Sequence, residues 1–237
     1  MSDFKNIIAK EFHNFVRLER EIFFKKDDDI NWLPKYQADD AKIMCPPFVG
    51  DNYKQGGLVI IPINPGGGNE KTNIRSDIGN LIYPSLYEFK DLNQNIENYY
   101  WEVFVPKFKE ATIAYPIYKQ MSDIFKYSET SLDDIAFFNF LPYRGKDNKY
   151  PIKKTDMDSI IPACIKYFVK PALDIIKPSL VVTFGSQVDI YIENYWKNFE
   201  FKKVSWNRSR APTPDVIKQR EATLYYLKNW AKSNKLQ

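Results

Sequence analysis

Short apolar runs separated by helical patterns constrain the fold of this chain more than any other feature. The first run, Gly57–Ile63, leads directly into Asn64-Pro65-Gly66-Gly67-Gly68, and Asp134–Phe140 and Ser179–Gly185 have the same character. Runs without polar alternation are typical of strands buried on both faces of a parallel sheet. A fourth strand is predicted for Phe199–Trp206, which precedes a polar segment.

The first 50 residues differ from the rest of the chain. Helical spacing of apolar residues such as Phe4, Ile8 and Phe12 predicts an amphipathic helix over residues 3–24. The stretch Trp32–Lys54 contains three prolines and is predicted to be a loop. We therefore expect residues 1–50 to form a helical and loop extension that packs on the domain.

Helical patterns fill the gaps between the predicted strands. The expected helices lie between Leu92 and Tyr127, over about residues 157–176, over about residues 187–196, and from Pro214 onward. The last helix has the clearest start, because Thr213 is a good N-cap and Pro214 suits the first helical position. Alternating strands and helices predict one α/β domain over residues 1–237, with a core at 57–230. We expect a three-layer α/β/α sandwich with a central four-stranded parallel sheet.

In an open parallel sheet, ligands bind outside the carboxyl ends of the strands. This rule selects segments 64–68, 139–144 and 207–211 as the candidate site. Glycines at 66–68 permit close approach of the backbone to a planar ligand. Neither the phosphate-loop spacing nor a GxGxxG motif is present. A site for a nucleoside triphosphate or a dinucleotide is therefore not predicted.

Composition restricts the class of protein. Hydrophobic residues make up 44% and charged residues 27%, which is ordinary for a soluble globular domain. Cys45 and Cys164 are the only cysteines and His13 is the only histidine, so we expect no disulfide framework, no metal site and no iron–sulfur cluster. No run approaches the roughly 18 apolar residues of a membrane span. We predict a cytoplasmic monomer without a cofactor or a membrane partner.

Positive charge is concentrated near the C-terminus. The formal net charge is only +4, yet the segment from Lys197 to the end has ten Lys and Arg against three Asp and Glu. Such a distribution favours a nucleic-acid partner. The alternative is a Lys-rich helix face that is simply solvated.

Four segments at the predicted strand ends resemble one family. Pro62-Ile63-Asn64-Pro65-Gly66 looks like the Gly-Ile-Asn-Pro-Gly motif of the mismatch-specific uracil and thymine DNA glycosylases. Residues 135–144 are similar to the family's second strand, and residues 163–188 to its helix, Lys-Pro turn and Gly-ended strand. Residues 207–211 resemble its terminal motif, Asn-Pro-Ser-Gly-Leu or His-Pro-Ser-Pro-Leu. The four occur in the family's order, so the chain is similar to the uracil-DNA glycosylase superfamily, closest to the mismatch-specific branch.

The resemblance implies a monofunctional DNA glycosylase that hydrolyses the N-glycosidic bond of uracil or of another deaminated or mispaired base. A flipped nucleotide from duplex or single-stranded DNA would enter a pocket at the strand ends. Asn64 would hold the attacking water, and Asn207 would donate toward the departing base or its phosphate. The other implied contacts are to the base, by Ile63, Pro65, Gly66, Asn139 and Tyr83, and to DNA phosphates, by Gly67, Arg208, Ser209 and Arg210.

The chain departs from the family pattern at several positions. Ala211 stands where a Leu wedges into the duplex, Pro62 and Arg208 replace a Gly and a Pro, and Ile74–Asp77 lacks the aromatic residue that stacks on the base. Tyr83 is the candidate substitute for that aromatic residue. These departures leave an alternative, a catalytically inactive glycosylase-fold module that binds nucleic acid or a protein. A hydrolase of free nucleosides or nucleotides is a third hypothesis, which the C-terminal charge disfavours.

Overall fold

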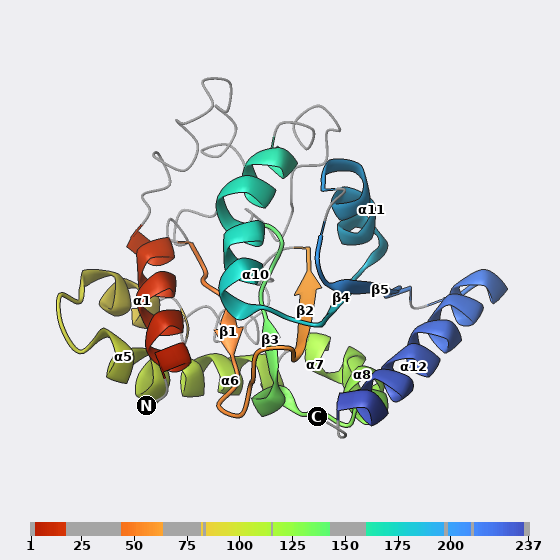
Figure 1. The fold of residues 1–237 in the computed structure, drawn as a ribbon, viewed down its shortest axis with the longest axis horizontal. Helices are drawn as coiled ribbons and strands as arrows, with labels where there is room; N and C mark the ends of the chain where they lie inside the picture. The colour runs from red at the N-terminus through yellow and green to blue at the C-terminus, as the bar shows by residue number, and fades with distance from the viewer. Residues whose placement is uncertain are drawn as a thin grey trace, which may run out of the picture.

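The computed structural model describes residues 3–17, 44–63, 82, 84–114, 116–142, 160–196, 199–209 and 211–234. These residues form an α/β fold around one five-stranded sheet with strand order β1-β3-β2-β4-β5 (Figure 1). The strands are β1 (Phe48–Val49), β2 (Leu58–Pro62), β3 (Ile135–Phe137), β4 (Leu180–Phe184) and β5 (Lys202–Trp206).

Four of the strands are parallel and the fifth is not. β2 pairs in parallel with β3 and with β4, and β4 pairs in parallel with β5. β1 pairs antiparallel with β3, so that Phe48 faces Phe137 and Val49 faces Ala136. The α/β class is confirmed, but the sheet is mixed and five-stranded, whereas the sequence predicted four parallel strands. A two-residue edge strand directly after Pro46-Pro47 carries too little pattern to be distinguished from the loop predicted there.

Helices connect the strands, and two of them contain a π-helical turn. The helical elements are α1 (Asp3–Arg17), residues 84–91, α5 (Ile96–Tyr99), the π-helical η1 (Tyr100–Phe104), α6 (Val105–Ala114), α7 (Pro116–Gln120), α8 (Ser122–Ser128), the 3₁₀ turn η2 (Leu132–Asp134), residues 160–164, the π-helical η4 (Ile165–Val169), α10 (Lys170–Ile176), α11 (Ser186–Tyr195) and α12 (Pro214–Asn234). None of the helices in the described ranges combines the length and apolarity needed to cross a bilayer.

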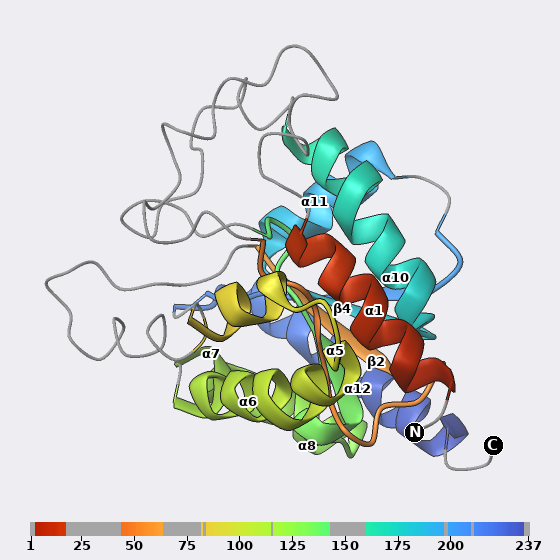
Figure 2. The same cartoon turned by 90° about the vertical axis from the view of Figure 1, so that its left-hand side faces the viewer.

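Helices lie on both faces of the sheet. Seen from two sides, α10 and α11 cover one face, while α6, α8 and α12 lie on the other (Figures 1 and 2). α1 packs beside α10 and α5. All residues of β2 and β4 are buried, as a strand covered on both faces requires.

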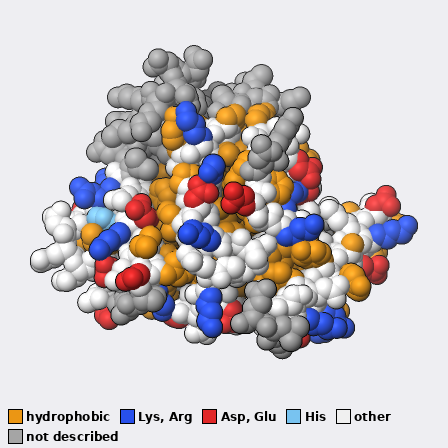
Figure 3. Space-filling model, in the orientation of Figure 1, with side chains coloured by type: hydrophobic (Ala, Val, Ile, Leu, Met, Phe, Trp, Pro, Cys, Tyr) orange, Lys and Arg blue, Asp and Glu red, His pale blue; other side chains and the backbone are white. Residues whose placement is uncertain are grey.

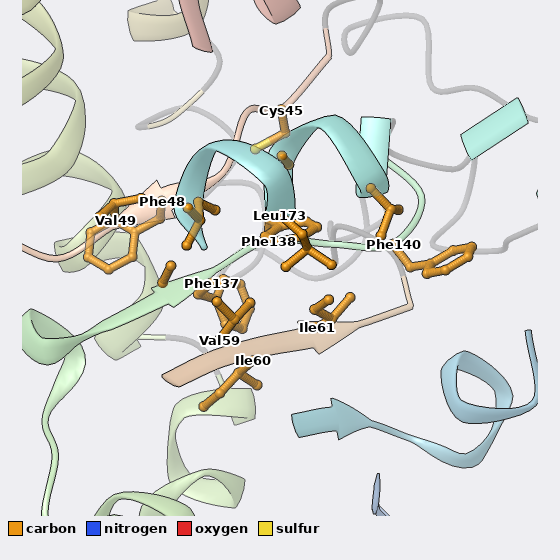
Figure 4. Close-up of a cluster of buried hydrophobic side chains, with 14 of the residues drawn as sticks. Cys45, Phe48, Val49, Val59, Ile60, Ile61, Phe137, Phe138, Phe140 and Leu173 are labelled. Atoms are coloured by element: carbon orange, nitrogen blue, oxygen red, sulfur yellow. The ribbon is translucent and has the colours of Figure 1, made fainter. Parts of the chain in front are cut away.

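Side chains of β2 and β3 alternate between the two helical layers. Phe138 and Leu173 meet between the sheet and α10, whereas Ile60 points to the opposite face (Figure 4). The ring of Phe138 lies 5.7 Å from that of Phe168, and the ring of Phe137 lies 6.1 Å from that of Phe108 on α6. The high aromatic content of the chain thus fills both layers of the core.

The N-terminal helix packs on the domain and contributes side chains to its core. Ile8, Phe12 and Val16 of α1 are buried, and the ring of Phe12 lies 5.9 Å from that of Tyr100. The indole N–H of Trp101 also donates to the carbonyl of Lys5, at 3.2 Å. Residues 3–17 therefore pack on the domain as expected, whereas residues 48–49, predicted to lie in a loop, form the edge strand β1. The predicted helical residues 18–24 lie outside the described residues.

The last helix begins where the sequence predicts. The backbone N–H of Val216 donates to the Thr213 hydroxyl at 3.4 Å, and that of Ile217 donates to the Thr213 carbonyl at 3.0 Å. One side of α12 is anchored to β5, since the Thr223 hydroxyl donates to the Ser205 carbonyl at 2.8 Å. The N-terminal end of α12 projects from the body of the domain (Figure 1).

Replacing Phe12 with Ala tests whether α1 is part of the core. Phe12 is fully buried, so its loss leaves a cavity and should lower the free energy of unfolding by about 3–5 kcal/mol. Urea unfolding followed by circular dichroism measures this change. Ile7→Ala is the matched control on the same helix, because Ile7 is 51% exposed and its replacement should cost less than about 0.5 kcal/mol. Equal effects of the two substitutions would show that α1 is dispensable.

His13 predicts a pH dependence of stability. Burial lowers the pKa of the His13 imidazole below its ordinary value of 6.5, and the nearby Arg17 lowers it further. Because the unfolded chain binds the proton more readily, the stabilisation is fully present above pH 6.5 and is lost as the pH falls toward the folded pKa. Urea midpoints at pH 7.5 and 5.5 should differ more for the native protein than for His13→Gln. The same difference in both proteins would contradict this prediction.

Candidate active site at the carboxyl ends of the strands

The four parallel strands end at one edge of the sheet. Beyond β3 the chain still follows β2, because the N–H groups of Phe140 and Leu141 donate to the carbonyls of Pro62 and Ile63, both at 2.8 Å. Beyond β4, the Gly185 N–H donates to the Trp206 carbonyl at 2.8 Å. The segments that follow the strands are therefore held in fixed register at this edge.

A hollow of about 210 Å³ opens between the ends of β2, β4 and β5. Its described lining consists of Ile63, residues 184–188 and residues 207–209. This volume is below the roughly 300–1,000 Å³ that is usual for drug-sized ligands, so the hollow suits a small planar ring or a phosphate group.

The first turn of α11 forms one wall of the hollow. Gly185 precedes the helix with φ of 118°, a conformation that side chains with a Cβ rarely adopt. This turn directs the strand into the helix, so that Ser186, Gln187 and Val188 line the hollow. The N–H groups of a first helical turn have no partner within the helix and carry partial positive charge. This wall therefore favours an anionic or electron-rich group.

The loop after β5 forms the opposite wall and is folded on itself. The Ser209 N–H donates to the side-chain carbonyl of Asn207 at 2.9 Å, and the Ser209 hydroxyl donates to the Ala211 carbonyl at 3.1 Å. The Asn207 amide oxygen is therefore occupied, while its NH₂ group remains a donor. A phosphate on Ser209 would have to compete with the Ala211 carbonyl for the hydroxyl proton.

Arg208 connects this loop with an element far away in the sequence. Its guanidinium carbon lies 5.2 Å from the centre of the Phe184 ring, and its Nε donates to the side-chain oxygen of Gln120 on α7 at 3.0 Å. Its Cδ would be 3.8 Å from a Cβ placed on Gly185. Arg208 thus brings a fixed positive charge to the rim of the hollow.

Asn139 lies at the end of β3 and is only 8% exposed. The rings of Phe138 and Phe140 pack against Phe168 and Tyr191. Because the chain is extended there, Asn139 points away from both phenylalanines. Its side-chain amide offers both a donor and an acceptor to a ligand at this edge of the sheet.

The structure brings part of the predicted site together. Asn139, Ile63, Arg208, Ser209 and Asn207 all lie at the carboxyl edge. The ends of β3 and β5 are separated by β2 and β4, which at about 4.8 Å per strand places Asn139 roughly 14 Å from Asn207. The two amides are therefore too far apart to contact the same ligand atom.

Other site predictions lie outside the described residues, namely Asn64, Pro65, Gly66, Gly67, Tyr83 and Arg210. Sequence reasoning also missed two parts of the site, the first turn of α11 and Gln120. A strand followed by Gly-Ser and a helix was the available signal for the α11 turn. Gln120 had no such signal, because it meets Arg208 only through tertiary packing.

The described side chains give no sign of a metal site or a reactive thiol. Among the residues that the structure describes, no three His, Cys, Asp or Glu side chains are grouped as metal ligands. Cys45 and Cys164 are both buried, and burial raises the pKa of the Cys45 thiol to about 12 and that of Cys164 further still. Both thiols are therefore protonated and inert near neutral pH.

Comparison with known proteins finds no family model that matches the chain and no curated protein that is similar to it. The interpretation of the site therefore depends on its own residues and geometry.

Gly185→Ala should destabilise the protein and distort the hollow. A Cβ at φ of 118° costs about 1–3 kcal/mol, although the nearest side-chain atom leaves room for it. Ser186→Ala is the control, since it removes only an exposed hydroxyl and should change the free energy of unfolding by less than about 0.5 kcal/mol. Urea unfolding of both variants checks this prediction, and a stable Gly185→Ala protein would contradict it.

Proposed function

We propose that this chain is a monofunctional DNA glycosylase that hydrolyses the N-glycosidic bond of uracil or of another deaminated or mispaired base. The observation that carries the proposal is the meeting, at one sheet edge, of segments that resemble the motifs of uracil-DNA glycosylases. These segments contain Ile63, Asn139 and the Asn207–Ser209 loop. In this proposal the four parallel strands are the core of a three-layer α/β/α glycosylase domain, and β1 is an addition to it.

Asn139 is proposed to bind the edge of the flipped base. An amide offers both a donor and an acceptor, which is the complement of a pyrimidine edge. The position of Asn139 just beyond the carboxyl end of β3, at the edge where open parallel sheets bind their ligands, supports this role.

The opposite side of the hollow is proposed to bind the sugar–phosphate backbone. The first turn of α11 offers backbone N–H groups, and Arg208 adds positive charge beside them. Asn139 and Asn207 are roughly 14 Å apart, which supports binding of the base by Asn139 and of the sugar–phosphate backbone on the Asn207 side. Ser209 and Arg210 would extend the phosphate contact along the strand.

The proposed reaction uses water as the nucleophile. Water attacks C1′ as the N-glycosidic bond breaks, the base leaves with the bonding electrons, and the proton of the water goes to solvent or to the base. Asn64 would orient the water, and the NH₂ group of Asn207 would donate toward the departing base or its phosphate. Because an amide is neither a base nor a counter-charge for the sugar cation, the reaction should be slower than in an Asp-bearing enzyme. The products are the free base and an abasic site.

DNA is the proposed partner, and the protein would act as a cytoplasmic monomer without a cofactor. The positive charge of the C-terminal segment supports DNA binding. On the face shown in Figure 3, however, both signs of charge occur along α12 and no single basic patch dominates. Phosphate contacts near the hollow should therefore contribute more to DNA binding than a general basic surface does.

A second candidate is a module that binds nucleic acid without catalysis. Ala211 is exposed at the position where a wedge residue would enter the duplex, and its methyl group is too small to hold a base out of the stack. This observation favours binding of single-stranded DNA, where no duplex has to be opened.

Abasic-site formation on labelled DNA tests the proposed function. Duplex and single-stranded substrates would carry uracil, hypoxanthine or a G·T mismatch. Asn64→Ala and Asn139→Ala should each lower the rate at least about a hundredfold, because each removes a contact to the reacting groups. Asn229→Ala is the control, since Asn229 is exposed on the far half of α12, and it should leave the rate unchanged.

DNA binding at several salt concentrations separates the alternatives. A protein that contacts phosphates loses affinity steeply as salt rises, whereas a hydrolase of free nucleosides does not respond to DNA. Salt-dependent binding without cleavage of any substrate would contradict the glycosylase proposal and support the module that binds nucleic acid without catalysis.

A further inference from the structure

One side chain of α12 reaches back to the loop that forms the wall of the hollow. The Nε of Arg220 donates to the carbonyl of Asn207 at 2.8 Å, and its terminal nitrogen donates to the carbonyl of Ser209 at 2.7 Å. The guanidinium carbon also lies 5.4 Å from the centre of the Trp206 ring. Arg220 therefore contacts three of the four residues from 206 to 209.

The positions of the Asn207 and Ser209 carbonyls suit the shape of a guanidinium. Its N–H groups form a rigid fork, and here two of them engage two carbonyls of the same turn. Hydrogen bonds from a charged donor are roughly twice as strong as neutral ones. Stacking on Trp206, a side chain that is 5% exposed, further restricts the orientation of the fork.

The part of α12 that carries Arg220 is also held in place. One turn beyond Arg220, the Thr223 hydroxyl donates to the carbonyl of Ser205 on β5 at 2.8 Å. β5, the 207–209 loop and α12 are thus held together by side-chain hydrogen bonds. Arg220 of α12 binds the loop, and Thr223 of α12 binds β5. Movement of the loop requires the two hydrogen bonds of Arg220 to break.

Arg220 also changes the chemistry that the loop presents. The main-chain carbonyls of Asn207 and Ser209 accept from the guanidinium, and the side-chain carbonyl of Asn207 accepts from the Ser209 N–H. Three oxygens that would repel an anion are thereby occupied. The NH₂ group of Asn207 remains a donor beside these occupied oxygens.

We propose that Arg220 is the positioning residue of the Asn207–Ser209 loop, which it holds in the conformation that receives a DNA phosphate and the departing base. The functional half of this inference rests on the proposed glycosylase activity. The mechanical half, that Arg220 holds the loop, does not depend on any activity and can be tested separately.

Limited trypsin digestion tests the mechanical half. The loop contains its own cleavage point, the Arg208–Ser209 bond, which trypsin can cut only when the loop opens. Arg220→Gln removes the charged fork and should raise the rate of cleavage at this bond at least about tenfold, as followed by mass spectrometry. Lys218→Gln is the matched control, because it removes the same charge from an exposed position on the same helix, and it should change the rate less than about twofold.

A conservative variant covers the case in which Arg220→Gln does not fold. Arg220→Lys keeps the charge but offers a point-like ammonium in place of the fork, so it should show an intermediate cleavage rate. Cleavage rates of both Arg220 variants equal to that of Lys218→Gln would overturn the inference.

Steady-state kinetics of abasic-site formation test the functional half. A purely destabilising substitution reduces the fraction of active protein, which lowers kcat and leaves KM unchanged. Loss of loop positioning should instead raise KM about tenfold for Arg220→Gln, with partial recovery in Arg220→Lys and no change in Lys218→Gln. An unchanged KM in an active enzyme would overturn the functional half. A loosened loop in a protein without glycosylase activity would support the mechanical half and refute the proposed function.

Discussion

The parallel pairing of β2 with β3 and β4 is the constraint on which the rest of the structure depends. β2 lies inside the sheet, is buried along its whole length and pairs with β4 at five positions, from Leu58 with Leu180 to Pro62 with Phe184. Because both neighbours run in the same direction as β2, all of their connections to the next element leave from one edge. The hollow, Asn139 and the 207–209 loop lie at the same edge of the sheet because these strands run in one direction.

Contacts from the helices hold the segments at this carboxyl edge of the sheet in place. Gln120 of α7 fixes Arg208, and Arg220 of α12 contacts the carbonyls on either side of Arg208. The first turn of α11 forms the opposite wall and follows Gly185, whose φ is 118°. Each wall is therefore held by an element from a different part of the chain, which couples the shape of the hollow to the packing of the whole domain.

The character of the site follows from what its walls contain. Neutral amides, helix-terminal N–H groups and one fixed guanidinium suit a neutral base attached to an anionic backbone. The described walls offer no carboxylate as a strong base, so the proposed hydrolysis relies on orientation of water and on charge near the phosphate. A protein with such a site is expected to be selective and slow, and its activity should respond strongly to loop position.

The sequence alone determined the local elements. Continuous apolar runs predicted β2, β3 and β4 to within a few residues, and the segment Phe199–Trp206 was predicted as the strand that is β5. Thr213-Pro214 predicted the start of α12, because capping acts over short distances. Only the tertiary structure decided the rest: the antiparallel β1, the inclusion of α1 in the core, and the contacts of Gln120 and Arg220 with the 207–209 loop. These depend on pairs such as Arg208 and Gln120, 88 residues apart, whose meeting is governed by packing of whole elements and leaves no local pattern.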